Sequence, residues 1–334
     1  MPQAAPDTSK RTTFLRRSAS TLGLWAVVAA ALASRQPWAY VGLVGVLTLI
    51  ATIEYFQMLK AGGVKCFPRF GILLAVAYSG LLYWMLLGTP PPAPPVRGST
   101  ELLGPDGAVS GLASTVTYSI VMLPDWLDGL AIFVAIAGAF TLQLRHPIRG
   151  LEPLQAVASN VLGFIYIAFL FNFAARLVFL VPGPGLVPGA MVLLWMIAVT
   201  KFTDMGAYIV GSMIGKHKMI PHVSPGKTWQ GFGGAILFAL LAGCGLYAFF
   251  REDMPHFAAG LHVLGGWPNV IVLSIVLCLL AVVGDLAESV VKRSLNVKDS
   301  GHMLPGIGGA LDLIDSLCFT APVLYFYLKW MPPL

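Results

Sequence analysis

The chain has 334 residues, of which 57% are hydrophobic and only 11% are charged. Soluble domains carry about 25% charged residues, so this composition excludes a water-soluble globular protein and indicates a membrane protein. The net charge of +6 does not call for nucleic acid, because the basic residues follow the loops of a membrane bundle. The cysteines form no C-x-x-C pair and have no histidine at ligand spacing, which disfavours disulfides and zinc. They are Cys66, Cys244, Cys278 and Cys318.

Residues 1–19 are polar and basic, and we expect them to be a disordered cytoplasmic tail. The short apolar segment that follows Arg16 and Arg17 fits either an uncleaved first span or a cleaved signal peptide. We favour the uncleaved span. Residues 20–334 should then form one membrane-embedded domain, with N-terminal helices over 20–190 and catalytic helices and cytoplasmic loops over 191–334.

Apolar segments recur along the chain, and nearly all of them are long enough to cross a bilayer as a helix. We find no strand-forming alternation and no internal repeat. The sequence therefore predicts an all-α, polytopic transmembrane helical bundle, since a helix satisfies its own backbone hydrogen bonds in lipid. The nine predicted spans are 20–34, 37–59, 69–88, 127–144, 154–181, 188–213, 231–251, 268–291 and 310–329.

The external loops are predicted from charge and proline content. Residues 89–98 form a proline-rich, semi-rigid linker, and the loop after it is acidic. Most lysines and arginines lie in loops on the opposite side of the predicted membrane. By the positive-inside rule, the N-terminus and the loops at 214–230 and 284–309 are cytoplasmic. The acidic residues assigned to the external loop are Glu101, Asp106, Asp125 and Asp128.

Acidic residues inside apolar helices are costly in a membrane and indicate function. In the segment 200–234, Asp204 follows Lys201 by three residues, so the two side chains can meet across one helical turn. This pair is either structural or part of a site. Glycines at 206, 211 and 215 allow a neighbouring helix to approach closely.

The loop after this helix contains the run PGKT. Pro221 stands where a Walker A motif needs its first glycine, so the run is not a P-loop. Ser224, Lys227 and Thr228 can nevertheless donate hydrogen bonds to phosphates at the membrane surface.

The segment 284–300 orders its charges along one helix face, with Asp285 and Glu288 deepest. A simple amphipathic exit from the membrane is one explanation. The order equally fits a metal held by carboxylates beneath a polyphosphate held by basic side chains. The remaining members of this face and the loop after it are Ser289, Lys292, Arg293 and Lys298.

In the segment 303–319, a glycine-rich turn precedes Asp312 and Asp315, which lie three residues apart on a helix. Adjacent carboxylates repel unless a cation lies between them, and such hard ligands suit Mg²⁺. The alternative is that the aspartates stabilise the helix N-terminus. Glu54 and Glu152 are interpreted as interfacial charges. The turn comprises Pro305, Gly306, Gly308 and Gly309, and the backbone amides of this turn other than that of proline can approach a phosphate.

Together these segments resemble the signatures of the phosphatidate cytidylyltransferase (CDP-diacylglycerol synthase) family over about the last 130 residues. The sequence departs from the family pattern at Ile307, Leu313, Gly226 and Gln230, where His, Arg, Lys and Glu are usual. The matching residues are Asp204, Ala207, Tyr208, Gly211, Ser224, Pro225, Lys227, Thr228, Trp229, Gly231, Gly234, Ser289, Lys292, Arg293, Lys298, Asp299, Pro305, Gly306, Gly308, Gly309, Asp312 and Asp315.

The resemblance implies an enzyme that transfers the cytidylyl group of CTP to phosphatidic acid, giving CDP-diacylglycerol and pyrophosphate. It implies Mg²⁺ as cofactor, with a second divalent ion or a monovalent cation left open, and a multi-pass location in the bacterial inner membrane. A homodimer is also left open. The expected catalytic residues are Asp204, Ser224, Lys227, Lys292 and Asp299; the substrate-phosphate ligands are Lys227, Thr228, Ser289, Lys292, Arg293, Lys298, Gly306, Gly308 and Gly309; and the metal ligands or their neighbours are Asp285, Glu288, Asp312 and Asp315.

Three alternatives remain at this point. A CTP-dependent lipid-alcohol kinase would release CDP instead of pyrophosphate. A secondary transporter would use buried carboxylates to couple cations, but the charges here cluster at one membrane face. A catalytically degenerate member of the family could act as a lipid-binding or scaffold protein, a hypothesis prompted by Ile307 and Leu313.

Overall fold

The structure is a computed structural model that describes residues 36–88, 96–103, 109–117, 126–180, 187–250, 261–301, 303 and 308–330, with a few helical residues between 23 and 34. It is mainly helical, and eight helical segments within the described residues are long and apolar enough to cross a membrane. They confirm eight of the nine predicted spans; the predicted span at 20–34 lies mostly outside the described residues. The helices are α2 Pro37–Ala61, α3 Pro68–Gly88, α4 Trp126–Gln143, the span made of α5 Glu152–Gly163, the π-helix η1 Phe164–Phe169 and α6 Phe173–Leu180, then α7 Val187–Ile214, α8 Trp229–Phe250, α9 Trp267–Ser294 and α10 Ala310–Trp330.

Prolines and glycines set several helix ends. Pro37 and Pro68 are the first residues of α2 and α3, where a missing backbone N–H costs nothing. Gly63 follows α2 with φ +73°, and Gly266 precedes α9 with φ +95°. Both glycines adopt conformations that side-chain-bearing residues rarely occupy, so the chain reverses direction between spans.

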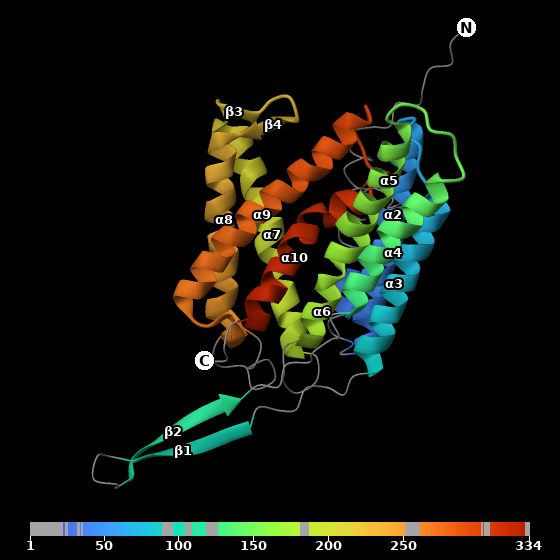
Figure 1. The fold of residues 1–334 in the computed structure, drawn as a ribbon. Coiled ribbons are helices and arrows are strands. Elements are labelled where there is room, and N and C mark those ends of the chain that lie inside the picture. The colour runs from blue at the N-terminus through green and yellow to red at the C-terminus, as the bar shows by residue number, and fades with distance from the viewer. Residues whose placement is uncertain are drawn as a thin grey trace.

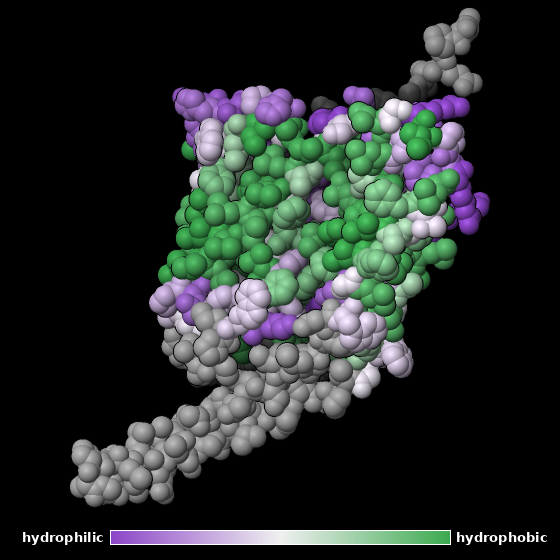
Figure 2. All heavy atoms as spheres, in the orientation of Figure 1, coloured by the Kyte–Doolittle hydropathy of each residue, from purple (hydrophilic) through white to green (hydrophobic). Residues whose placement is uncertain are grey.

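The spans run alternately up and down, so the loops at 62–67, 144–151, 215–228 and 295–301 lie at one end of the bundle (Figure 1). We call this the basic end, because among the described residues these loops hold most of the lysines and arginines that lie outside the spans. Between the two ends, the face shown in Figure 2 is mainly apolar. Large exposed side chains such as Trp84, Phe133 and Leu241 lie on the spans, as expected for helices that face lipid.

Two antiparallel hairpins accompany the predicted helical bundle, although the sequence shows no strand-forming alternation. Strand β1 Val96–Leu103 pairs with β2 Val109–Thr117, and the hairpin projects from the end opposite the basic end (Figure 1). Strand β1 also takes in the last residues of the linker predicted at 89–98. At the basic end, β3 Lys218–Ile220 pairs with β4 Ser224–Thr228. Strands of three to five residues are too short to show a sequence alternation.

Glycines allow α7 and α8 to pack closely, as predicted for this helix. A Cβ atom on Gly206 would lie 2.5 Å from the carbonyl oxygen of Gly234, and one on Gly231 would lie 2.8 Å from the carbonyl oxygen of Ala207. Such close approach is the usual basis of helix association in lipid. It places the β3–β4 hairpin directly over the ends of these two helices.

Asp128 was assigned to an external loop, but it lies in the first turn of α4. Its two carboxylate oxygens accept hydrogen bonds from Arg176 of α6 at 2.8 and 2.5 Å. The Tyr78 hydroxyl donates to Asp128 and accepts from Arg176. Arg176, which the sequence places inside a span, is therefore paired and joins α3, α4 and α6.

Candidate active site

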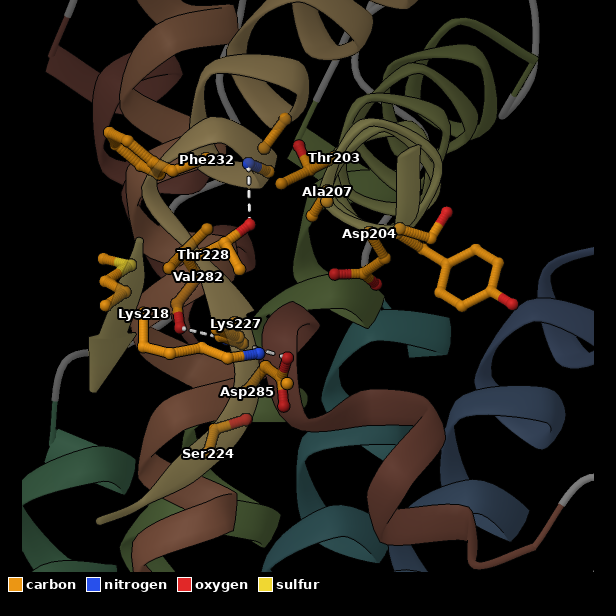
Figure 3. A pocket seen from close by; sticks show the side chains of 17 residues that line it. Thr203, Asp204, Ala207, Lys218, Ser224, Lys227, Thr228, Phe232, Val282 and Asp285 are labelled. Atoms are coloured by element: carbon orange, nitrogen blue, oxygen red, sulfur yellow. Dashed lines mark hydrogen bonds and ion pairs between the residues drawn. The ribbon is translucent and has the colours of Figure 1, made fainter. Parts of the chain in front are cut away.

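A cavity of about 520 Å³ opens between α7, α8, α9 and the β3–β4 hairpin at the basic end (Figure 3). The hairpin contributes mainly polar side chains to its lining, and the helices contribute both apolar side chains and the carboxylates of Asp204 and Asp285. The predicted site residues that line it are Asp204, Ser224, Lys227, Thr228 and Asp285. The fold thus brings together side chains of α7, β4 and α9. These elements lie in two of the segments that the sequence singled out, 200–234 and 284–300.

Lys227 lies at the centre of the polar wall. Its Nζ is 2.9 Å from Oδ2 of Asp285 on α9 and 3.4 Å from the carbonyl oxygen of Val282 (Figure 3). The ammonium group therefore lies between the hairpin and the helix that carries the acidic residues. In this position it can contact an anion in the cavity.

Asp204 faces the same cavity from α7, where its side chain is 41% exposed. Its Oδ2 lies 3.7 Å from Nζ of Lys201, which also donates to the carbonyl oxygen of Leu313 at 3.1 Å. The structural ion pair considered from the sequence is thus present. It coexists with a place in the cavity wall.

Asp285, Glu288 and Asp315 form a group in which one oxygen from each residue lies within 4.8 Å of the others. Glu288 and Asp315 are buried, whereas Asp285 also borders the cavity. Gly284 makes this arrangement possible: a Cβ there would lie 2.8 Å from the Asp315 carbonyl oxygen. The missing side chain lets α9 and α10 cross where their carboxylates face each other.

The geometry of this carboxylate group fits a divalent cation. Asp315 Oδ1 accepts hydrogen bonds from the backbone and hydroxyl of Ser316, and Glu288 Oε2 pairs with Lys292 at 2.6 Å. Glu288 Oε1 is buried and has no hydrogen-bond partner among the described residues. Buried polar atoms are rarely left without a partner, and carboxylate oxygens are hard donors of the kind that bind Mg²⁺.

Asp312 lies outside this group, although the sequence grouped it with the metal ligands. Its Oδ1 is 2.7 Å from Lys292 Nζ, and its Oδ2 accepts from Ser300 Oγ at 2.7 Å and from the Gly309 backbone at 3.1 Å. Asp312 thus stabilises the first turn of α10 and the loop before it. Lys292, bound to Glu288 and Asp312, links the end of α9 to this turn.

The predicted phosphate ligands other than Lys227 are spread over several places at the basic end. Thr228 Oγ1 accepts from the Gly231 backbone at 3.1 Å and caps α8. Gly308 has φ +114° in the turn before α10, while Pro305 and Gly306 lie outside the described residues. The predicted catalytic and phosphate-binding residues that the structure describes at the basic end but that do not line the cavity are Ser289, Lys292, Arg293, Lys298, Asp299, Gly308 and Gly309.

The sequence interpretation missed Glu54, which was assigned as an interfacial charge. Glu54 on α2 is fully buried. Its Oε2 accepts from the Leu311 backbone at 3.1 Å, and its Oε1 accepts from the Met303 backbone at 3.3 Å. It therefore holds both the N-terminus of α10 and the loop before it. The available signal was its position inside an apolar span, near the end that the sequence predicts to be cytoplasmic.

Tyr166 was also missed. It lies on the π-helix η1, and its buried hydroxyl has no hydrogen-bond partner among the described residues. The Tyr166 ring packs edge-on against Phe319 of α10, the helix that also carries Asp315. A π-helical turn inside a helix often marks a functional site, but no feature of the FIYIAF segment distinguishes it from an ordinary apolar span.

The chain is similar to known proteins over much of its length. The profile of the family described as "Cytidylyltransferase family" matches residues 98–331. The chain is 33% identical over 60% of its length to an Escherichia coli protein named "Uncharacterized protein YnbB", of which the match spans 63%. It is 31% identical over 84% of its length to the phosphatidate cytidylyltransferase of Staphylococcus aureus, covering 96% of that protein. It is 29% identical over 99% of its length to the Mycobacterium bovis phosphatidate cytidylyltransferase, covering 93% of it. The chain therefore belongs to the cytidylyltransferase family and is a membrane-embedded nucleotidyltransferase.

Proposed function

We propose that this enzyme transfers the cytidylyl group of CTP to phosphatidic acid and releases pyrophosphate, with Mg²⁺ bound at the carboxylate group and the reaction at the cytoplasmic membrane face. The observation that carries the proposal is the 2.9 Å contact between Lys227 and Asp285. This pair joins the cavity of about 520 Å³ to the group formed by Asp285, Glu288 and Asp315. The names of the bacterial relatives supply the substrate pair.

The chemistry requires two anions to meet. An oxygen of the phosphatidate phosphate forms a bond to the α-phosphorus of CTP, and the bond between the α-phosphorus and the bridging oxygen breaks. Pyrophosphate leaves with that electron pair. The nucleophile is already an anion near neutral pH, so the protein needs no strong base and acts mainly by positioning the reactants and stabilising charge.

Lys227 is the residue of this chain best placed to act on the phosphates. Its ammonium group faces the cavity beside Ser224 of the same strand. On this proposal it exchanges part of its contact with Asp285 for the triphosphate and compensates the charge of the leaving pyrophosphate. Asp204, on the opposite wall, orients Lys201 and limits how deeply an anion enters.

Asp285, Glu288 and Asp315 would hold the metal, and the unpaired Glu288 Oε1 is the atom that most needs such a partner. Bound Mg²⁺ would supply charge neutralisation between the carboxylates and the substrate phosphates. Gly284 keeps the three carboxylates together whether or not the ion is bound, because it fixes the crossing of α9 and α10.

The lipid substrate is proposed to enter from the bilayer. Tyr208 and Phe232 line the cavity on its apolar side, and Tyr208 is 76% exposed on the lipid-facing surface of α7. The water-soluble nucleotide enters from the basic end. The excess of lysine and arginine at that end supports its cytoplasmic orientation.

The test is pyrophosphate release by detergent-purified protein, with CTP, phosphatidate and Mg²⁺ each omitted in turn. We expect release to require all three. Asp315→Asn and Glu288→Gln should reduce it by at least a hundredfold while the protein stays folded. Glu152→Gln, which removes an exposed carboxylate at the same end, is the matched control and should leave it unchanged. Release of CDP would support the lipid-alcohol kinase instead, and substantial activity of Asp315→Asn would refute the metal assignment.

A further inference from the structure

A second cavity lies at the basic end and shares no lining residue with the first. Its volume is about 780 Å³, and it is enclosed by the α2–α3 loop, the start of α3, the end of α4 and the start of α5. Typical ligand sites in proteins occupy about 300–1,000 Å³. The proposed cytidylyl transfer makes no use of this cavity.

Its polar lining is predominantly cationic. Lys60, Lys65 and Arg69 line it together with His146, and the one acidic residue in the lining is Glu152. Glu152 is paired with Lys65. Lys60 and Arg69 have no ion-pair partner among the described residues, and both are exposed. Two cations are therefore available to bind an anion.

The thiol of Cys66, which also lines this cavity, adds no negative charge. Burial raises the pKa of the Cys66 thiol, against a smaller lowering by Lys60. The group is thus neutral at physiological pH. The electrostatic character of the cavity is determined by the lysines and the arginine.

The other walls are apolar and fixed in place. Phe70 packs so closely on α4 that a Cβ at Gly138 would lie 2.3 Å from its ring. The Phe67 ring stacks on His146 at 5.6 Å, and its backbone N–H donates to Asn160 Oδ1 at 3.2 Å. Leu73, which also lines the cavity, is 68% exposed on the lipid-facing surface. The cavity is thus preformed, with an apolar side toward the bilayer and a cationic side toward water.

We propose that this cavity binds the headgroup and upper acyl chains of an anionic phospholipid. The phosphate would lie between Lys60 and Arg69, and the acyl chains would run along Phe70 and Leu73 toward the bilayer. Basic pockets between transmembrane helices at the cytoplasmic face are known to bind anionic lipid headgroups. A water-soluble anion would not use the apolar side, which is why a lipid fits better than free phosphate.

The proposal does not depend on the reaction of the first cavity, because its readout is lipid retention and not turnover. The probe is dioleoyl-phosphatidylglycerol added to the delipidated, detergent-purified full chain, with binding counted by native mass spectrometry. Dioleoyl-phosphatidylcholine tests the need for negative charge, and glycerol phosphate tests the need for acyl chains. We expect tight retention of one phosphatidylglycerol, weaker retention of phosphatidylcholine, and no competition by millimolar glycerol phosphate.

The variant Lys60→Gln/Arg69→Gln should weaken retention about 10- to 30-fold, since each basic side chain beside a lipid headgroup contributes a factor of about five. The swap Lys60→Arg/Arg69→Lys keeps the charge and should restore binding. Arg145→Gln/Arg149→Gln removes two exposed cations from the neighbouring loop without touching the cavity, and should change retention less than threefold. Equal losses in the two Gln pairs would show general surface attraction and overturn the proposal. Competition by glycerol phosphate would overturn it in favour of a soluble-anion site.

Discussion

Replacing Glu54 should destabilise the protein strongly, whereas replacing Glu152, the other glutamate near the basic end of a span, should not. This side chain is fully buried on α2 and accepts hydrogen bonds from the backbones of Met303 and Leu311. Glu54→Ala removes both acceptors and leaves two N–H groups without partners near the start of α10. Glu54→Gln keeps the shape of the side chain, and its carbonyl oxygen can still accept from one of the two backbone N–H groups. Its NH2 group faces the other N–H, where two donors cannot pair.

The size of the effect follows from these two bonds. A hydrogen bond in a protein contributes about 1 kcal/mol net, and a buried donor left unpaired costs about 1–3 kcal/mol. Glu54→Ala should therefore lower the free energy of unfolding by about 3–5 kcal/mol, and Glu54→Gln by roughly half as much. The Lys292–Asp312 contact should loosen as well, because Asp312 lies in the turn of α10 that Glu54 holds.

The assay is unfolding of the purified protein in mixed micelles of dodecyl maltoside and SDS, followed by tryptophan fluorescence. Glu152→Ala is the control, because Glu152 is the other glutamate predicted to be interfacial and its partner Lys65 is also exposed. It should leave the unfolding midpoint nearly unchanged. A Glu54→Ala protein as stable as the Glu152→Ala protein would refute the structural role of Glu54.

Two further changes test the helix contacts. Gly284→Ala would place its Cβ 2.8 Å from the Asp315 carbonyl oxygen, whereas a Cβ at Gly245 meets nothing within 4 Å. Gly284→Ala should thus cost about 1–3 kcal/mol and impair pyrophosphate release, and Gly245→Ala should do neither; equal behaviour of the two would contradict the close crossing of α9 and α10. Asp128→Asn should leave Arg176 buried with an incomplete partner and cost about 3–5 kcal/mol in the same unfolding assay. The double variant Asp128→Asn/Arg176→Met should recover part of that loss, and a fully additive loss would show that the pair does not interact.

Much of this protein could be predicted from its sequence because membranes constrain sequences strongly. A span needs about 20 apolar residues, so eight helices could be located to within a few residues. The cost of a charge in lipid made Asp204, Asp285, Glu288 and Asp315 conspicuous. The spacing of Asp285 and Glu288 was enough to place them on one face of a helix.

The sequence left open which of these acidic residues meet, because that depends on how the helices cross. Asp312 and Asp315 are three residues apart, yet only Asp315 joins Asp285 and Glu288, while Asp312 binds the turn before α10. Gly284 decides this, since the backbones of α9 and α10 touch there.

Long-range contacts explain the residues that were missed. Glu54 bonds to a backbone group 257 positions away, and no local pattern records such a partner. Tyr166 owes its place to a π-helical segment that its apolar sequence does not indicate. The short hairpin β3–β4, which lies between α7 and α8 in the chain, carries Lys227 to the cavity. The sequence by itself determined where the spans lie and which kinds of residue form the candidate site. Both follow from whether each segment lies in lipid or in water. The tertiary structure alone decided which charged groups face one another, because that is set by helix crossings between segments far apart in the chain.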